Sequence, residues 1–277
     1  MNPGWRAVWD DGGGRVGMVL LALLSAIVIL GPAALPDPRV MPDIAHGALL
    51  GPSSGHLLGT DHHSRDVLSR VVWGGRVSLA VAIGAVALSV TIGALVGLIA
   101  GYAGGALDSV LMRLVDAALA VPRLFLLLIM VAIMERIPLA VLILSVGATG
   151  WFGTSRLVRS EVLRLRALDF VRGAEALGAS RRRIIFRHLL PGIAAPLAAA
   201  TTLAVGDVIL LEAGLSFLGL GVQPPTPSWG GMIFDAKPYL VTAPWTSLAP
   251  GLAIVLTVLG VNLVGEALTR SAGGFRV

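Results

Sequence analysis

Cysteine is absent from the chain, and charged and aromatic residues are scarce. Without cysteine, the protein has no disulfide, no thiolate metal ligand and no cysteine nucleophile. Aromatic residues make up 5% of the 277 residues, too few for base stacking along a nucleic acid, so we exclude nucleic acid as a partner. Charged residues make up 13%, about half the share found in soluble domains. Because 56% of the residues are apolar and the mean hydropathy is +0.86, the composition predicts an all-α, polytopic membrane protein.

Six apolar runs are candidates for membrane spans, since a crossing helix needs about 20 largely apolar residues. The third run is short, and residues 107–120, which contain Arg113 and Asp116, would extend it as a kinked lead-in before Pro122. The first run resembles a signal peptide but lacks a small-residue cleavage site, so we expect a retained anchor. The predicted spans are residues 16–35, 77–100, 121–134, 139–156, 196–220 and 248–268.

The distribution of basic residues predicts the orientation. With six spans, 13 basic residues fall on the side of the two termini and six fall on the opposite side. Segments rich in arginine and lysine stay in the cytoplasm, so we expect both termini to be cytoplasmic. This bias also accounts for the net charge of +5 without a nucleic-acid partner.

A run of glycines continues from the second span at a spacing of four residues. Small residues at this spacing line one face of a helix and allow a second helix to approach closely. We therefore expect a tightly packed central helix, although glycine is also simply common in membrane helices. The glycines are Gly93, Gly97, Gly101 and Gly105.

Acidic residues within the predicted spans are candidates for a translocation path. Asp207 and Glu212 lie in the fifth span, and Glu266 lies near the end of the sixth. A carboxylate at the centre of a membrane helix costs about 2.5–3.5 kcal/mol, so it usually faces a bundle interior or water. A structural hydrogen bond to another helix is an equally good explanation. We add Asn262, a polar residue of the sixth span, to the candidate path.

Residues 156–191 leave the membrane and contain nine arginines. We expect a short helix from Phe170 to Leu177 that stops at Gly178, followed by a second helix that Ser180 caps and Pro191 ends. The small residues of the first helix would let it lie deep in a partner's groove. An ordinary basic loop and a DNA-binding helix-turn-helix are the alternatives, but both ends of the segment are tied to the bilayer.

This segment resembles the EAA loop of ABC importer permeases. The resemblance rests on Ala174-Glu175-Ala176-Leu177-Gly178-Ala179-Ser180 and on His188-Leu189-Leu190-Pro191. Aligned on Gly178, the chain has Arg172, Gly173 and His188 where the family pattern has glutamate, alanine and isoleucine. The resemblance implies a loop that couples the permease to an ATPase. Its residues would be Phe170, Arg172, Gly173, Ala174, Glu175, Ala176, Leu177, Gly178, Ala179, Ser180, Leu190 and Pro191.

Other segments are similar to the C-type permease subunit of dipeptide, oligopeptide and nickel importers. They are residues 56–61, 64–70, 212–221, 224–230, 250–253 and 262–265. The resemblance implies a cytoplasmic (inner) membrane subunit that pairs with a second homologous permease, two cytoplasmic ATPases and an extracytoplasmic solute-binding protein. It also implies an importer core over residues 77–270, an N-terminal anchor and outer segment over 1–76, and a cytoplasmic tail over 271–277.

The chain has no GxxxxGK[ST] phosphate loop, so we expect ATP and Mg²⁺ to be bound by the partner ATPases and no cofactor in this chain. Without HExxH or a convincing Ser–His pair, an intramembrane enzyme is not supported. A secondary transporter that uses Asp207 and Glu212 as ion sites is the other alternative, but we find no inverted repeat.

The outer segment before the second span holds two further candidates. Residues 64–73 have helical spacing of valine and leucine, which favours an amphipathic helix on the outer surface. His56, Asp61, His62 and His63 cluster just before it. Imidazoles bind metals, but we expect solvated loop residues and no metal site. A nickel or other metal permease of the same family remains an alternative.

Overall fold

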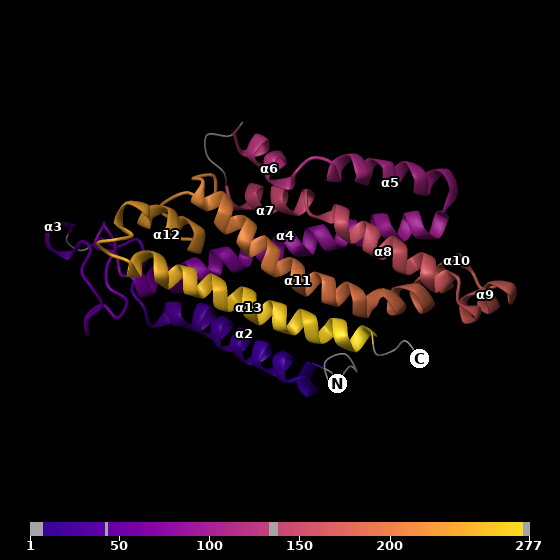
Figure 1. Cartoon of the computed structure of the whole chain (residues 1–277), viewed down its shortest axis with the longest axis horizontal. Coiled ribbons are helices and arrows are strands. Elements are labelled where there is room, and N and C mark those ends of the chain that lie inside the picture. Colours follow the sequence, from indigo (N-terminus) through magenta and orange to yellow (C-terminus); the bar gives the residue numbers. More distant parts are fainter. Residues whose placement is uncertain (1–7, 42–43, 133–137, 274–277) are drawn as a thin grey trace.

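The computed structural model describes residues 8–41, 44–132 and 138–273, and the helices in these ranges form one elongated bundle (Figure 1). Within these ranges no strand is present, only an isolated bridge between Thr60 and Asp66. The long helices are α2 (Gly12–Leu30), α4 (Val67–Ala103), α11 (Leu190–Phe217) and α13 (Trp245–Gly273). The shorter helices are α3 (Ile44–Gly47), α5 (Gly105–Leu119), α6 (Arg123–Ala132), α7 (Leu139–Ala148), α8 (Trp151–Arg166), α9 (Asp169–Ala176), α10 (Arg181–Ile184) and α12 (Trp229–Ala236).

Five helical segments among the described residues are long and apolar enough to cross a membrane. They correspond to the first, second, fourth, fifth and sixth predicted spans. The third predicted span falls on α6, with residues 133 and 134 outside the described residues. Helices α5 and α6 follow each other in the same direction along the bundle (Figure 1). Pro122 separates them, because a proline lacks the N–H that would continue the helix.

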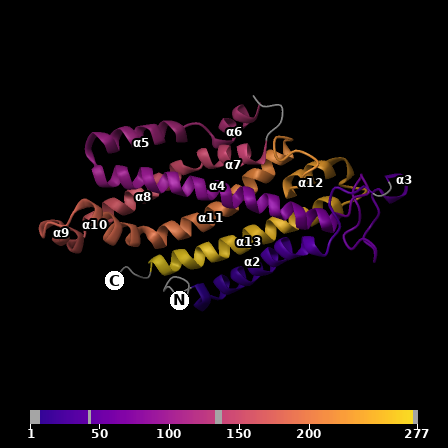
Figure 2. The same ribbon diagram turned by 180° about the vertical axis from the view of Figure 1, so that it is seen from behind.

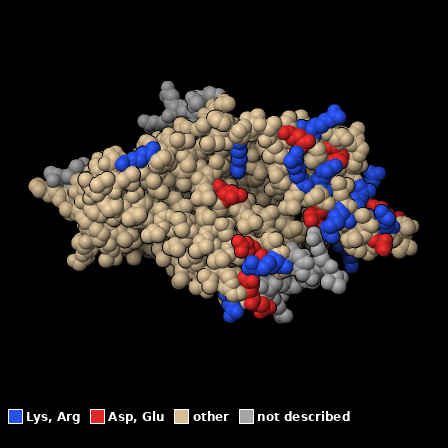
Figure 3. Space-filling view, viewed as in Figure 1, with Lys and Arg blue, Asp and Glu red and all other residues tan. Residues whose placement is uncertain are grey.

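The two ends of the bundle differ in composition. Helices α9 and α10, the start of α2 and the end of α13 lie at one end, whereas α3 and α12 lie at the other (Figures 1 and 2). In Figure 3 charged side chains crowd the end formed by α8, α9 and α10, and the middle of the bundle is almost uncharged. An uncharged belt is the surface that hydrocarbon requires.

Helix α4 packs against α8 along its glycines. A Cβ atom on Gly93 would lie 2.8 Å from the Trp151 carbonyl oxygen, and one on Gly101 would lie 2.9 Å from the Val162 Cβ. A Cβ on Gly97 would collide with the Ser155 carbonyl oxygen. The absence of side chains at these three positions therefore sets the helix separation. Gly105 differs from the expectation: it begins α5 with φ +61° and has no such neighbour.

Two expected helix boundaries are wrong. Residues 64–73 do not form a separate surface helix, because α4 begins at Val67 and runs unbroken into the second span. Asp66 caps it, accepting a hydrogen bond from the Ser69 backbone N–H at 2.8 Å. Val67 and Val72 are buried, so the apolar spacing reflects core packing rather than a membrane surface.

Pro191 does not end a helix. A π-helical turn over Ile185–Leu189 joins α10 to α11, so the helix that begins at Arg181 continues to Phe217. Pro191 lies in the first turn of α11. Proline has no N–H to donate, and the wider π turn just before it lets the helix continue without that bond.

Candidate coupling and translocation sites

The predicted coupling loop is a compact projection at the charged end of the bundle. Its base is apolar: Val171 of α9 and Ile184 of α10 are buried against Val158, Val162 and Leu165 of α8. The Phe170 and His188 rings lie 5.9 Å apart, so the histidine at the family's isoleucine position packs against α9. This base fixes α9 to the end of α8.

The tip of the projection is exposed and apolar. Leu177 is 91% exposed and Phe170 is 54% exposed. Gly178 has φ +79°, and its N–H donates to the Glu175 carbonyl at 2.9 Å while that of Ala179 donates to Ala174 at 3.0 Å. These bonds end α9 in a left-handed glycine turn that a side chain would strain.

The remaining predicted loop residues gather at the same place. Ser180 caps α10, since its Oγ accepts from the Arg183 N–H at 3.4 Å. Leu190 and Pro191 lie one helical segment further on, at the start of α11. The exposed members are Arg172, Gly173, Glu175, Ala176, Leu177, Gly178, Ser180 and Pro191, whereas Ala174, Ala179 and Leu190 are half-buried.

Arginine side chains of α8 form hydrogen bonds to α4 and α5 near the predicted coupling loop. Arg166, at the end of α8, donates from Nη1 to the Tyr102 carbonyl at 2.8 Å and to the Gly101 carbonyl at 3.3 Å. Arg159 of α8 makes a two-pronged pair with Asp108 of α5, at 2.5 and 2.6 Å. Helix α8 therefore links α9 to α4 and α5.

The three candidate path residues differ in their exposure. Glu212 is buried, and it accepts hydrogen bonds from Ser78 Oγ at 3.1 Å and from Ser216 Oγ at 2.8 Å. Asp207 is exposed on α11. Asn262 of α13 is half-buried, with its Oδ1 3.4 Å from the place of a Cβ on Gly206. Glu212 is thus enclosed by hydrogen-bonding hydroxyls, whereas Asp207 is exposed.

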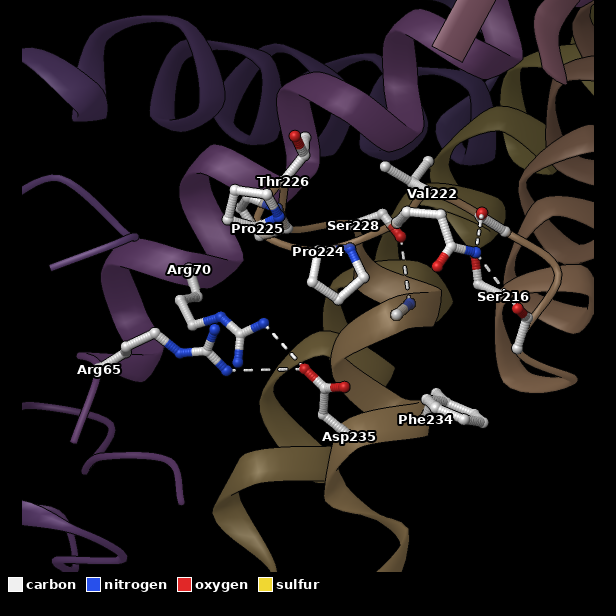
Figure 4. A pocket seen from close by; sticks show the side chains of 15 residues that line it. Arg65, Arg70, Ser216, Val222, Pro224, Pro225, Thr226, Ser228, Phe234 and Asp235 are labelled. Atoms are coloured by element: carbon white, nitrogen blue, oxygen red, sulfur yellow. Dashed lines mark hydrogen bonds and ion pairs between the residues drawn. The ribbon is translucent and has the colours of Figure 1, made fainter. Parts of the chain in front are cut away.

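Sequence reasoning missed a buried charge cluster at the opposite end of the bundle. Arg65 donates from Nε to Asp61 Oδ2 at 2.7 Å, and Arg70 binds the same carboxylate. Arg70 also pairs with Asp235 of α12 at 3.1 Å, as Figure 4 shows. Asp61, Arg65 and Arg70 lie inside the 56–61 and 64–70 segments of the family resemblance, which were the available signal, whereas Asp235 lies outside every such segment.

Burial and the neighbouring charges act in opposite directions on the cluster. Burial by itself would raise the pKa of Asp61, but Arg70, Arg65 and backbone N–H groups together lower it below its usual value. Burial and the nearby Arg70 charge lower the pKa of Arg65, whereas Asp61 opposes that change. The cluster joins the outer segment and the start of α4 to α12.

The charge cluster leaves few free ligand atoms for a metal ion. The possible ligand atoms of Asp61, His62 and His63 lie within 4.8 Å of one another. The Asp61 carboxylate already binds two arginines, and their positive charges oppose a cation. The His62 ring stacks on Tyr239 at 5.3 Å. The arrangement therefore favours an ion-pair cluster over a metal centre.

Comparison with known proteins identifies the family. The family described as "Binding-protein-dependent transport system inner membrane component" matches residues 93–272. The chain is 40% identical over 257 residues to the dipeptide transport system permease protein DppC of Alkalihalophilus pseudofirmus, covering 91% of this chain and 83% of that one. It is 42% identical to the glutathione transport system permease protein GsiD of Pectobacterium atrosepticum, covering 79% and 72%.

A third relative is named for the transport of a different solute, nickel. The chain is 38% identical over 255 residues to the nickel transport system permease protein NikC of Escherichia coli, covering 92% of this chain and 91% of that one. These matches run along most of both chains, as the resemblance of the separate segments implied. The chain therefore belongs to the binding-protein-dependent transport system inner membrane components and is a multi-pass permease subunit of an ABC importer.

Proposed function

We propose that this subunit is non-catalytic and carries peptides or closely related small solutes inward across the cytoplasmic membrane. The relatives named for dipeptide and glutathione transport support this solute class. We further propose one second homologous permease, two cytoplasmic ATPases that bind ATP and Mg²⁺, and one extracytoplasmic solute-binding protein as partners. Membrane lipid is a further proposed partner, with anionic headgroups around the exposed arginines.

One observation carries the coupling role: the exposed apolar tip of α9 stands on a buried base. Leu177 is almost fully exposed and Phe170 is about half exposed, while Val171 and Ile184 are buried beneath them. Such a tip would fit a groove on an ATPase subunit. Closure of the ATPases around ATP would move α9, and α8 would pass the movement to α4 and α5.

The topology follows from the same arrangement. The described ends of α2 and α13 lie at the end of the bundle that carries α9 and α10 (Figure 1). An ATPase-coupling loop must face the cytoplasm, so we propose that both termini are cytoplasmic.

Two alternatives have less support. An ion-coupled secondary transporter would need Asp207 and Glu212 as accessible sites, but Glu212 is enclosed by serine hydroxyls. A nickel permease has the support of the relative named for nickel transport. Against it, the Asp61 carboxylate is occupied by two arginines.

The test is to tag the chain in its native membrane, solubilise it gently and identify the proteins that co-purify. We expect a second permease, ATPases with a phosphate loop and a solute-binding protein. Reconstitution of that complex then allows ATP-dependent uptake of labelled dipeptides and of Ni²⁺ to be compared. Isolation of a lone protein that transports without ATP would overturn the proposal.

A further inference from the structure

Arg123 is a charged residue that lies at the depth of the apolar crossing helices. It is the first residue of α6, and its Nη2 donates to the Val146 carbonyl at 2.5 Å. Its Nε donates to Thr149 Oγ1 at 3.2 Å. Both partners belong to the candidate membrane span that starts at Leu139, and the helix rises roughly 15 Å between Leu139 and Thr149. The guanidinium therefore lies near the middle of a hydrocarbon layer about 30 Å thick.

The Arg123 side chain is held in place and still has unused donors. Its two hydrogen bonds use two of the five N–H groups of a guanidinium. Among the described residues it makes no ion pair with an acid. A bare charge in lipid is costly, so an arginine at this depth usually faces a bundle interior or an aqueous path. Arg123 thus has donors available for an anion that the described chain does not supply.

A cavity of about 190 Å³ adjoins Arg123. It lies where two helix breaks meet, because Pro122 separates α5 from α6, and Thr149 and Gly150 separate α7 from α8. Among the described residues, Arg123 is the only charged one that lines the cavity, so no acid in its wall neutralises the guanidinium. The apolar residues of the wall are Ala118, Leu119, Val121, Leu126 and Phe152.

The start of α8 adds positive character to the same cavity. Gly150, Phe152 and Gly153 line it, and no side chain caps α8. The first N–H groups of a helix have no partner within the helix, and they form the positive end of its dipole. Arg123 also lies close to this helix start, since a Cβ on Gly150 would be 2.8 Å from its Nη2. The cavity therefore favours an anion.

The composition of the wall restricts the chemical class of that anion. A phosphate or sulfate ion has oxygens on all sides and would leave several of them against apolar side chains. A carboxylate has both oxygens at one end, where they match the planar guanidinium. The rest of an organic molecule can then lie against Leu126 and Phe152. Lipid headgroups stay at the membrane surface, so the complementary ligand is a small organic acid within the membrane.

We propose that the cavity at Arg123 is a binding site for the carboxylate of the transported solute. This inference rests on the proposed transport of peptides, which carry a C-terminal carboxylate. The unused N–H groups of Arg123 bind the carboxylate, and the uncapped start of α8 adds to the attraction. One fixed cation in an apolar wall binds weakly enough to release the solute, as a permeation site must.

The absence of cysteine allows the cavity to be probed in the complete, detergent-solubilised importer. Val121→Cys places a thiol on the cavity wall, at a position 42% exposed, and Val241→Cys places a reference thiol outside it. Each thiol is modified with an anionic and with a cationic methanethiosulfonate reagent of similar size. We expect the ratio of anionic to cationic rates at Val121→Cys, normalised to Val241→Cys, to fall about tenfold when Arg123→Gln is added. Arg123→Lys keeps the charge and should keep most of the ratio.

Protection of the thiol by a solute tests the ligand class without any change at Arg123. We expect alanyl-alanine to slow the modification of Val121→Cys, and alanyl-alaninamide, which lacks the carboxylate, to leave it unchanged.

Uptake is then measured in proteoliposomes, with the binding protein loaded with labelled alanyl-alanine. Arg123→Gln should lower uptake about tenfold, because the solute loses its cationic partner within the membrane. Arg15→Gln is the control, since it removes an exposed arginine of α2 that does not line the cavity, and it should match the wild type. Both variants should still co-purify with the second permease.

Four results would overturn the inference. An unchanged rate ratio in Arg123→Gln would show that this charge does not act on the cavity. Loss of the anionic preference in both Arg123→Lys and Arg123→Gln would make Arg123 a cap of α7 only. Equal protection by alanyl-alanine and its amide would remove the carboxylate as the ligand. Loss of the second permease from the Arg123→Gln complex would make Arg123 a subunit contact instead.

A failure of the proposed function would look different. The wild-type importer would hydrolyse ATP without accumulating alanyl-alanine, while the rate ratio at Val121→Cys would still depend on Arg123. That result would overturn peptides as the solute class and leave the anion-binding cavity in place.

Discussion

Ser78 of α4 donates a hydrogen bond to the buried carboxylate of Glu212 in α11, with 3.1 Å between Oγ and Oε2. The same hydroxyl accepts a hydrogen bond from the Trp229 N–H at the start of α12, at 3.2 Å. One serine therefore ties three helices together. Trp229 strengthens the junction, since its Nε1 donates to the Val71 carbonyl at 2.8 Å.

Removal of the Glu212 carboxylate should loosen this junction. Glu212→Ala leaves the Ser78 and Ser216 hydroxyls without their acceptor and opens a void, so we expect a loss of about 1–3 kcal/mol of stability. Glu212→Gln keeps an acceptor oxygen and should lose much less. The melting temperature of the detergent-solubilised chain measures both. A Glu212→Ala protein as stable as the wild type would show that the bonds contribute nothing net.

The close packing of α4 against α8 should make the fold sensitive to the addition of a single methyl group at Gly97. Gly97→Ala would place a Cβ against the Ser155 carbonyl, which is backbone and cannot rotate away, so we expect a loss of about 1–3 kcal/mol. Gly153→Ala is the matched control, because Gly153 lies in α8 with open space around it. Thermal unfolding compares the two. Equal melting temperatures would contradict glycine-limited packing.

The buried charge cluster should make stability depend on acid pH. The folded-state pKa of Asp61 lies below its ordinary value of about 3.8, so its stabilisation is complete above that pH. It is lost as the pH falls through the lower, folded-state pKa. Asp61→Asn should therefore destabilise the protein at pH 7, by about 3–5 kcal/mol if Arg65 and Arg70 stay buried.

Melting temperatures from pH 7 to pH 2 would check this. The difference between the wild type and Asp61→Asn should persist down to about pH 4 and shrink below it. A difference that does not change with pH would mean that the aspartate is not charged in the folded protein.

A bulky residue at the tip of the coupling loop should uncouple ATP hydrolysis from transport. Gly178→Trp adds an indole where α9 would meet the ATPase and strains a backbone with φ +79°, so we expect uptake to be abolished while membrane insertion is normal. Gly104→Trp is the control, since Gly104 also has positive φ and open surroundings, at the end of α4. Normal uptake by Gly178→Trp would remove the coupling role.

The absence of cysteine allows a direct test of orientation. Leu177→Cys and Val241→Cys introduce a thiol at opposite ends of the bundle, at positions that are 91% and 94% exposed. In cells that lack the partner ATPases, which would otherwise cover Leu177, a membrane-impermeant maleimide should label Val241→Cys once the outer envelope is permeable and Leu177→Cys only after the cytoplasmic membrane is opened. The reverse pattern would invert the proposed topology.

Local sequence accounts for a large part of the fold. Apolar runs of the required length predicted the long helices, because a single helix satisfies its own backbone in lipid. The signals at Gly178 and Ser180 also predicted the end of α9 and the start of α10, since a left-handed turn and a capping hydroxyl act within a few residues.

Only the tertiary structure separated the roles of Asp207 and Glu212. The sequence presents both as acids in one apolar helix, and Ser78, which encloses Glu212, lies 134 residues away. The buried cluster has the same origin, because Arg70 meets Asp235 across 165 residues. Pro191 is a further case, since the π turn that carries the helix past it is not a local preference of those residues.

The sequence by itself thus determined which long segments are apolar enough to cross a membrane and where α9 ends and α10 begins, since those features depend on hydrophobic length and on contacts between near neighbours. The tertiary structure decided which polar groups are enclosed by partner side chains and which stay exposed. That choice depends on side chains brought together from distant parts of the chain, and the burial of a charge is favourable only once those partners are in place.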